Sequence, residues 1–177
     1  MSNVCLKYYL ICVVICCQTE LFSQFQICGN PVNLSNDCAD ACVVCELNGA
    51  AGTTSHTIPG NAPPGYCTFV VHSIRYFAFV AGSTSLSFNV NVTGCTLGNS
   101  IELGVYDTPD CSSFNLVSNC NTYMPKGVHG FTAGPLKIGC PYYIVIDGNG
   151  PASCSFIVTV TSGSATAPVP GIGGNIM

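Results

Sequence analysis

Apolar and polar residues alternate most clearly at 85–93. Every second position there is apolar and the positions between are Ser, Asn or Thr; the apolar residues are Leu86, Phe88, Val90 and Val92. Because successive side chains of a strand point to opposite faces, this period of two predicts a strand with one face on a core and one in solvent. Similar runs, separated by turn-forming clusters, recur at 74–80, 101–107, 142–147 and 155–161.

No stretch of ten or more residues beyond the N-terminal segment keeps the period of 3.6 that a helix requires. The pattern therefore predicts an all-β, antiparallel two-sheet β-sandwich with a jelly-roll-like architecture. We expect a lead-in at 24–37 and the sandwich at 38–161. Gly, Pro and Ser dominate 162–177, which is typical of a linker or of the truncated start of a following module.

Residues 1–23 have the composition of a secretory signal peptide. Lys7 precedes an apolar core at 8–17, and a short polar exit follows. The core is shorter than the roughly 20 residues that a transmembrane helix needs. A lipoprotein acylated at Cys16 or Cys17 is an alternative, although Ile15 is not the small residue that such processing prefers. We therefore expect an exported protein, secreted or at the cell surface, without a transmembrane segment.

Ten of the fourteen cysteines follow this leader, and an even number in an exported chain predicts disulfides. The loop between Cys111 and Cys120 is polar and turn-rich, so we expect these two to pair. A bond between Cys140 and Cys154 would join the strands beside the turn at 147–150. The other six are expected to pair partly within the N-terminal group and partly with the last two: Cys28, Cys38, Cys42, Cys45, Cys67 and Cys95.

The spacing of Cys38, Cys42 and Cys45 also matches the C-x3-C-x2-C pattern of an iron–sulfur ligand set. Such clusters, like a structural zinc site, need reduced thiolates. Export and the even count of cysteines favour disulfides, so we expect no metal at these residues.

Charged residues make up only 7% of the chain. Beyond the leader, Arg75, Lys126 and Lys137 are outnumbered by seven acids, which leaves no basic surface for a phosphate backbone. We therefore expect no nucleic-acid partner.

No catalytic constellation is visible. The three histidines, His56, His72 and His129, lie in different segments without a carboxylate or cysteine at ligand spacing, and no G-x-S-x-G motif occurs. We expect no enzyme within these residues and no cofactor. The sharper alternative is calcium, since four oxygen-bearing side chains would converge if their loops met at one end of the sandwich: Asp107, Asp110, Asp147 and Asn149. Each aspartate also lies in or beside a turn, where Asp commonly bonds its own backbone.

Several motifs together resemble the N-terminal β-sandwich domains of large secreted surface proteins of Bacteroidetes-type bacteria. These motifs are 76–79 (YFAF), 104–107 (GVYD), Cys111 with Cys120, 139–148 (GCPYYIVIDG) and 154–156 (CSF). Such domains are similar to pre-peptidase C-terminal and CUB-like sandwiches, and they commonly precede PKD or Ig-like modules and a type IX sorting domain. The chain departs from them at Ile74 and Arg75, where an aromatic residue is frequent, and it has no Trp.

Two functions are consistent with these observations. The first is a non-enzymatic adhesion or binding module that contacts glycan or protein through end loops, for which we select 106–110 and 147–150. The second is an accessory domain of a larger secreted protease or glycosidase whose catalytic part lies outside this chain.

Overall fold

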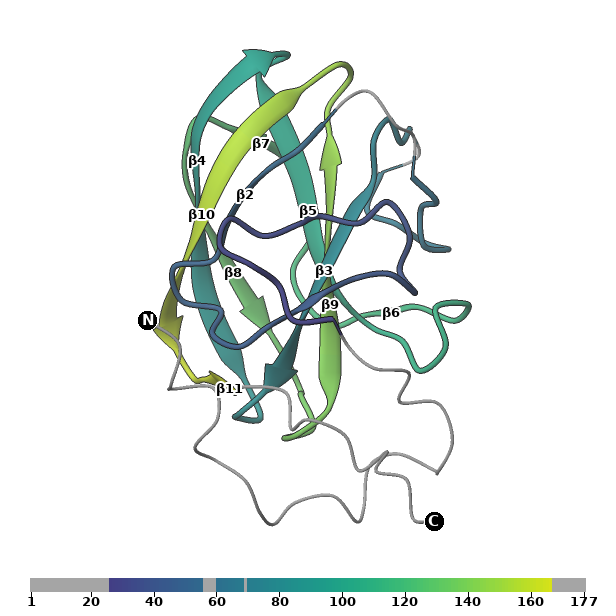
Figure 1. The fold of residues 1–177 in the computed structure, drawn as a ribbon, viewed down its shortest axis with the longest axis vertical. Coiled ribbons are helices and arrows are strands. Elements are labelled where there is room, and N and C mark those ends of the chain that lie inside the picture. Colours follow the sequence, from purple (N-terminus) through teal and green to yellow (C-terminus); the bar gives the residue numbers. More distant parts are fainter. Residues whose placement is uncertain (1–25, 56–59, 69, 167–177) are drawn as a thin grey trace.

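The computed structural model describes residues 26–55, 60–68 and 70–166. Within them the chain forms a two-sheet β-sandwich (Figure 1). The predicted signal peptide at 1–23 and residues 167–177 of the predicted linker lie outside the described residues. The strands are β1 (Val43–Val44), β2 (Ala51–Thr53), β3 (Arg75–Ala81), β4 (Leu86–Leu97), β5 (Ser100–Asp107), β6 (Asn115–Leu116), β7 (Asn121–Pro125), β8 (Gly127–Ala133), β9 (Pro141–Gly148), β10 (Ser153–Ser162) and β11 (Ala165–Thr166).

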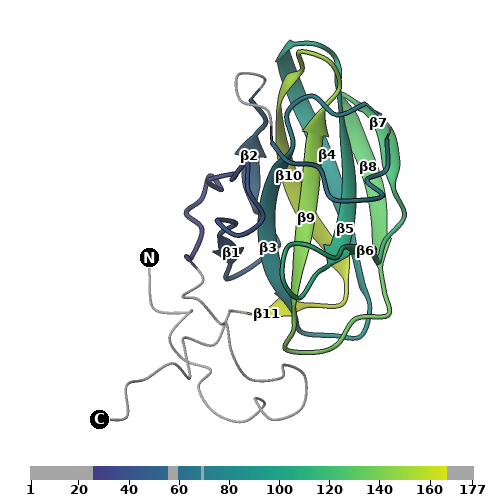
Figure 2. The same ribbon diagram turned by 90° about the vertical axis from the view of Figure 1, so that its right-hand side faces the viewer.

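One sheet, which we call sheet A, has the order β1-β3-β9-β5-β6, with β11 beside β3 and β7 beside β5. The other, sheet B, has the order β2-β10-β4-β8. The chain crosses between the sheets at most connections from β3 to β11, and all described pairs are antiparallel except β1 with β3. Figure 2 shows the two sheets face to face. The all-β, jelly-roll-like sandwich predicted from the sequence is confirmed.

The main core fills the space between the sheets. On β4, Phe88 is buried and its ring centroid lies 5.4 Å from that of Phe131 on β8, whereas Asn89 is only partly buried. Phe77 of β3 stacks in the same way on Phe156 of β10, at 6.2 Å, so aromatic pairs lie both within sheet B and between the sheets. The predicted inward and outward faces of β4 are therefore confirmed.

The outer face of sheet A is covered by a second apolar cluster. Strands β3 and β5 are buried along almost their whole length, and so is β9. Three segments supply the covering residues, at 38–43, 62–67 and 111–114, and we call them the cover. They contact side chains such as Tyr76, Tyr106 and Val145. Sheet A therefore has apolar contacts on both faces, whereas sheet B has them on one.

The folded region is wider than the predicted 38–161. In the lead-in, Val32 is buried, and Ile27 and Ser35 form isolated bridges with Val43 and Tyr76. At the other end, β10 ends at Ser162, and β11 then pairs with β3. Both extensions are held by backbone hydrogen bonds to β3. Composition does not reveal such bonds, so the boundaries predicted from it lie too far inward.

Four disulfides join described residues, and neither of the two specific pairs predicted is among them. They are Cys28–Cys42, Cys38–Cys111, Cys67–Cys120 and Cys95–Cys154. Cys45 is also disulfide-bonded, and Cys140 is buried in the core. The first bond confirms pairing within the N-terminal group.

The predicted pairs Cys111–Cys120 and Cys140–Cys154 are wrong, as is the pairing of Cys67 and Cys95 with the N-terminal group. Cys111 and Cys120 each bond a different segment that covers sheet A, instead of closing their own loop. Cys154 bonds Cys95 because the two are direct partners in the β10–β4 register, with Cα atoms 3.9 Å apart.

A side-chain amide occupies part of the free edge of β8. The Oδ1 atom of Asn119 accepts a hydrogen bond from the Thr132 backbone N–H at 2.8 Å, and its Nδ2 atom donates to the Gly130 carbonyl at 3.2 Å. Asn119 thereby takes the place that a residue of a neighbouring strand would occupy.

Candidate functional site

The four side chains predicted to hold calcium do not come together. Asp107 ends β5, whereas Asp147 pairs with Glu102 near the opposite end of that strand. Antiparallel pairing thus places the loops at 106–110 and 147–150 at opposite ends of sheet A. Asp110 follows Asp107 in the first loop, and Asn149 follows Asp147 in the second. The expected convergence of these loops is therefore wrong.

Asp110 bonds its own turn, as the alternative interpretation expected. Its carboxylate accepts hydrogen bonds from the backbone N–H groups of Ser112 and Ser113, at 2.9 and 3.0 Å. Hydrogen bonds from the side chain and backbone of Ser112, and then from Ser113, lower the pKa of this exposed carboxyl. Among the described residues, no group of three or more His, Cys, Asp or Glu side chains is placed to hold a metal ion.

The two described histidines lie apart. The Nε2 atom of His129 is 2.7 Å from the Pro125 carbonyl, and the Nδ1 atom of His72 is 3.6 Å from a carboxylate oxygen of Asp147. His56 lies outside the described residues.

A pair of carboxylates lies under the cover. Glu102 and Asp147 are direct partners on neighbouring central strands, so their side chains leave the same face of sheet A. Both are buried, at 5% and 0% exposure. The Asp147 carboxylate accepts hydrogen bonds from the backbone N–H groups of His72, at 3.0 and 3.2 Å, and Ser73, at 2.6 Å. These donors stabilise negative charge on Asp147.

The surroundings of this pair raise the pKa of Glu102. Loss of water contact and, next, the neighbouring Asp147 carboxylate raise the pKa of Glu102 from 4.5 to about 7. Burial and then the same two carboxylates also raise the pKa of Tyr66. The Arg75 guanidinium lies nearby and donates to the carbonyls of Ile74 and Ser55, at 2.8 and 3.0 Å; burial lowers its pKa, and Asp147 opposes this.

Sequence reasoning did not select Glu102. One signal was available, because Glu102 interrupts an otherwise apolar run at 101–106 in which both strand faces are apolar. Such a run is typical of a strand buried on both sides, and a carboxylate inside it is then expected to be buried.

The outer face of sheet B is open and carries no charge. The strands β2, β4, β8 and β10 contain no Asp, Glu, Lys or Arg. Register places their outward side chains in rows across the sheet, mostly hydroxyls and amides with two exposed apolar residues. The rows are Thr53–Ser155, Ile157–Asn91–Val128, Thr159–Asn89–Gly130 and Ser162–Ser87–Thr132.

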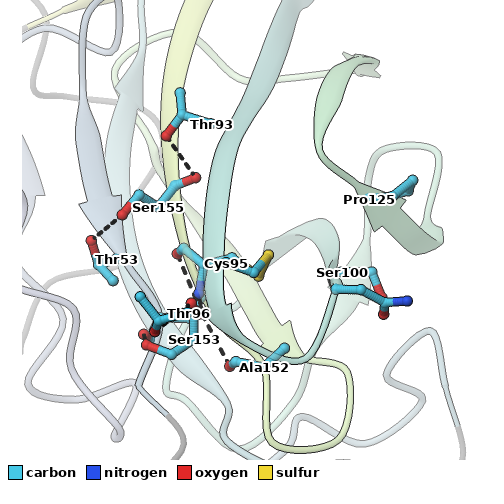
Figure 3. The surroundings of a disulfide bond; sticks show 12 residues. Thr53, Thr93, Cys95, Thr96, Ser100, Pro125, Ala152, Ser153 and Ser155 are labelled. Carbon is cyan, nitrogen blue, oxygen red and sulfur yellow. Dashed lines mark hydrogen bonds between the residues drawn. A yellow bond between two sulfur atoms is a disulfide. The ribbon is translucent and has the colours of Figure 1, made fainter.

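Hydrogen bonds between strands hold several of these side chains in place. The hydroxyls of Thr53 and Ser155 lie 2.9 Å apart, and the Thr93 hydroxyl donates to the Ser155 carbonyl at 3.3 Å. Figure 3 shows this row beside the disulfide of Cys95. Farther along, the hydroxyls of Ser87 and Thr132 are 3.1 Å apart. This face is therefore a fixed array of neutral donors and acceptors.

A small hollow lies beside the start of β11. Its volume is about 150 Å³, below the roughly 300 Å³ at which small-molecule pockets begin. It is lined by Glu46, Leu47, Asn48, Val160, Gly163, Ser164 and Ala165.

No helix within the described residues is long and apolar enough to cross a membrane. Comparison of the chain with models of known families, with curated proteins and with solved structures finds no match. A function is therefore argued from the residues of this chain alone.

Proposed function

We propose that the domain is a non-enzymatic, extracellular binding module, and that it contacts neutral glycan through the outer face of sheet B. The four described disulfides support the compartment, because disulfides persist in oxidising environments. The observation that carries the choice of surface is the uncharged array of hydroxyl and amide side chains on β4, β8 and β10.

The chemistry of this face matches that of a neutral sugar. Ser and Thr hydroxyls and the Asn amide each offer both donors and acceptors, as sugar hydroxyls do. Ile157 and Val128, 37% and 63% exposed, flank Asn91 in one row and supply apolar contact for the C–H faces of a sugar ring. Because neither this face nor a neutral oligosaccharide carries a charge, binding does not strip water from any ionic group, and no ion pair is needed to offset such a cost.

The end loops expected from the sequence are weaker candidates. Asp147 and Tyr106 are fully buried, and their loops lie at opposite ends of sheet A. Side chains on the outer face of sheet B are accessible without any rearrangement, and their strands are fixed by the core beneath.

Binding to a glycan array by the purified protein and a double variant, Asn89→Ala with Asn91→Ala, tests the proposal. We expect the wild type to bind neutral oligosaccharides and the variant to bind at least about fivefold more weakly, because each of the two lost hydrogen bonds is worth about 0.5–1.5 kcal/mol. Asn36→Ala with Asn115→Ala removes two exposed amides elsewhere and should leave binding unchanged. Because the face is uncharged, affinity should be almost independent of salt.

Equal binding by both double variants would place the contact on another surface. Preference for acidic glycans, or absence of any glycan binding, would overturn the proposed ligand class.

A further inference from the structure

Among the described residues, three buried side-chain oxygen atoms have no hydrogen-bond partner, and all three belong to one cluster. They are the Tyr66 hydroxyl, the Ser73 hydroxyl and the Oε2 atom of Glu102. Ser73 contacts Asp147 through its backbone N–H, and Asp147 is the direct strand partner of Glu102. Unsatisfied buried polar atoms are rare in folded proteins, so three of them beside one carboxylate pair indicate a site with a role beyond packing.

Two buried carboxylates on directly paired residues of neighbouring strands are not both readily ionised. Asp147 is favoured as the charged member, since backbone N–H groups already bond it, whereas Glu102 has an unpartnered oxygen and a pKa raised to about 7. Other ionisable side chains lie around the pair. The chain before β3 contributes His72 and Tyr66, strand β3 contributes Arg75 and Tyr76, and strand β5 contributes Tyr106. Strand β7, on the far side of β5, contributes no charged residue.

The carboxylate pair and the segment that lies over it are held in different ways. Glu102 and Asp147 are fixed in the ladder between β5 and β9. Tyr66 comes from the segment at 60–68, which forms no strand. This segment is secured by a turn bond from the Tyr66 N–H to the Pro63 carbonyl at 3.0 Å, by a hydrogen bond from the Tyr76 hydroxyl to the Asn61 carbonyl and by the Cys67–Cys120 disulfide. The Tyr66 ring contacts Tyr106 with centroids 6.1 Å apart.

We propose that Glu102 carries a proton beside the buried Asp147 carboxylate, and that this proton controls how closely Tyr66 covers sheet A. With the proton on Glu102, the pair has one negative charge and Tyr66 stays over it. When the proton leaves to solvent, two adjacent buried carboxylates remain, and separation of Tyr66 from them admits the water that their charge requires. The strand register and the disulfide stay intact, so the change is local and reversible.

Carbon-13 NMR of the protein labelled at glutamate carboxyl carbons tests the first half of the proposal. The sequence has three glutamates, of which Glu20 lies in the predicted leader. Glu46→Gln then distinguishes the signal of the exposed Glu46 from that of Glu102. We expect the Glu102 signal to titrate near pH 7. Titration near the ordinary glutamate value of about 4.3 would overturn the proposal that Glu102 is protonated beside Asp147.

Hydrogen exchange of the Tyr66 amide tests the second half. After correction for the intrinsic pH dependence of exchange, we expect its opening constant in the wild type to rise at least about tenfold between pH 5.5 and 8.5, because opening is linked to release of the Glu102 proton. In Glu102→Gln it should change less than about twofold, while Glu46→Gln should behave as the wild type does.

Tyr66→Ala provides a reciprocal test that does not depend on how well Glu102→Gln folds. Uncovering the pair should lower the Glu102 titration midpoint by at least about one pH unit, since lost burial is the larger cause of its shift. An unchanged midpoint, or equal exchange of the Tyr66 amide in wild type and Glu102→Gln at every pH, would show that cover and proton are not coupled. These results are independent of whether sheet B binds glycan.

Discussion

The two sheets of this sandwich meet in one core but have different outer faces. The outer face of sheet B is exposed to solvent, and its strand β4 alternates between buried apolar and partly exposed polar residues. Sheet A is covered, and its strands β3, β5 and β9 are buried on both faces. Three of the four described disulfides end in residues around the cover, whereas the fourth, Cys95–Cys154, joins two strands of sheet B.

The difference shows what the cysteines contribute. Strands are held by a continuous ladder of backbone hydrogen bonds, but the cover has few such bonds and relies on apolar contact with sheet A. Cross-links between distant segments reduce the freedom of the unfolded chain most, and two of these bonds span 53 and 73 residues. Covalent links are therefore concentrated where regular secondary structure is scarce.

Adjacent substitutions on one strand of each sheet should distinguish the two environments most strongly. On β4, Phe88→Ala should lower the free energy of unfolding by about 3–5 kcal/mol, because it leaves a cavity against Phe131. Asn89→Ala should change it by no more than about 0.5 kcal/mol. On β9, Ile144→Ala and Val145→Ala should both be destabilising, each by at least about 1.5 kcal/mol, because both residues are fully buried.

Denaturant unfolding with the disulfides intact measures all four variants. Equal losses at Phe88 and Asn89, or a negligible loss at Val145, would contradict the contrast between a one-faced and a two-faced sheet.

Removal of one cover disulfide should give the next largest effect. Cys38→Ser with Cys111→Ser should destabilise the protein by about 2–4 kcal/mol, because the bond closes a span of 73 residues in the unfolded chain. Hydrogen exchange should show faster opening at 38–43 and 111–114 than in β4. If exchange in β4 increased as much as exchange in the cover, the cover would not be a separately secured layer.

The last contrast concerns two carboxylates, one on the surface beside the cover and one beneath it. The pKa of Asp110 is lowered, so its contribution to stability is present above pH 3.8 and is lost as pH falls through the folded-state value. The pKa of Glu102 is raised, so stability should instead fall as pH rises from 4.5 to about 7. Urea unfolding from pH 3 to 8 should show both slopes.

Asp110→Asn should remove only part of the acid slope, and Glu102→Gln only the slope towards neutral pH. A wild-type profile that stays flat between pH 4.5 and 7 would contradict the burial of an uncharged Glu102.

Local pattern predicted the strands well but not their partners. All five alternating or apolar runs became strands, because burying apolar side chains requires the period that the sequence shows. Strands β7 and β8 were missed, since Pro125, Lys126 and two glycines interrupt the pattern at 121–133.

The pairing of Cys111 was wrong for a different reason: its partner Cys38 is close only after the cover has folded over sheet A. The Glu102–Asp147 pair likewise depends on register between strands about 45 residues apart, which no local pattern contains.

The amide of Asn119 has a consequence for self-association. A β domain with so few charges lacks the electrostatic repulsion that keeps many proteins apart, and the β8 edge would otherwise present free donors and acceptors to another copy. Asn119 occupies the Thr132 donor and the Gly130 acceptor, and it adjoins Cys120, which the bond to Cys67 secures. We therefore expect reduction of the Cys67–Cys120 bond to loosen the Asn119 amide and to leave the Thr132 N–H and the Gly130 carbonyl at the β8 edge open to pairing with another copy.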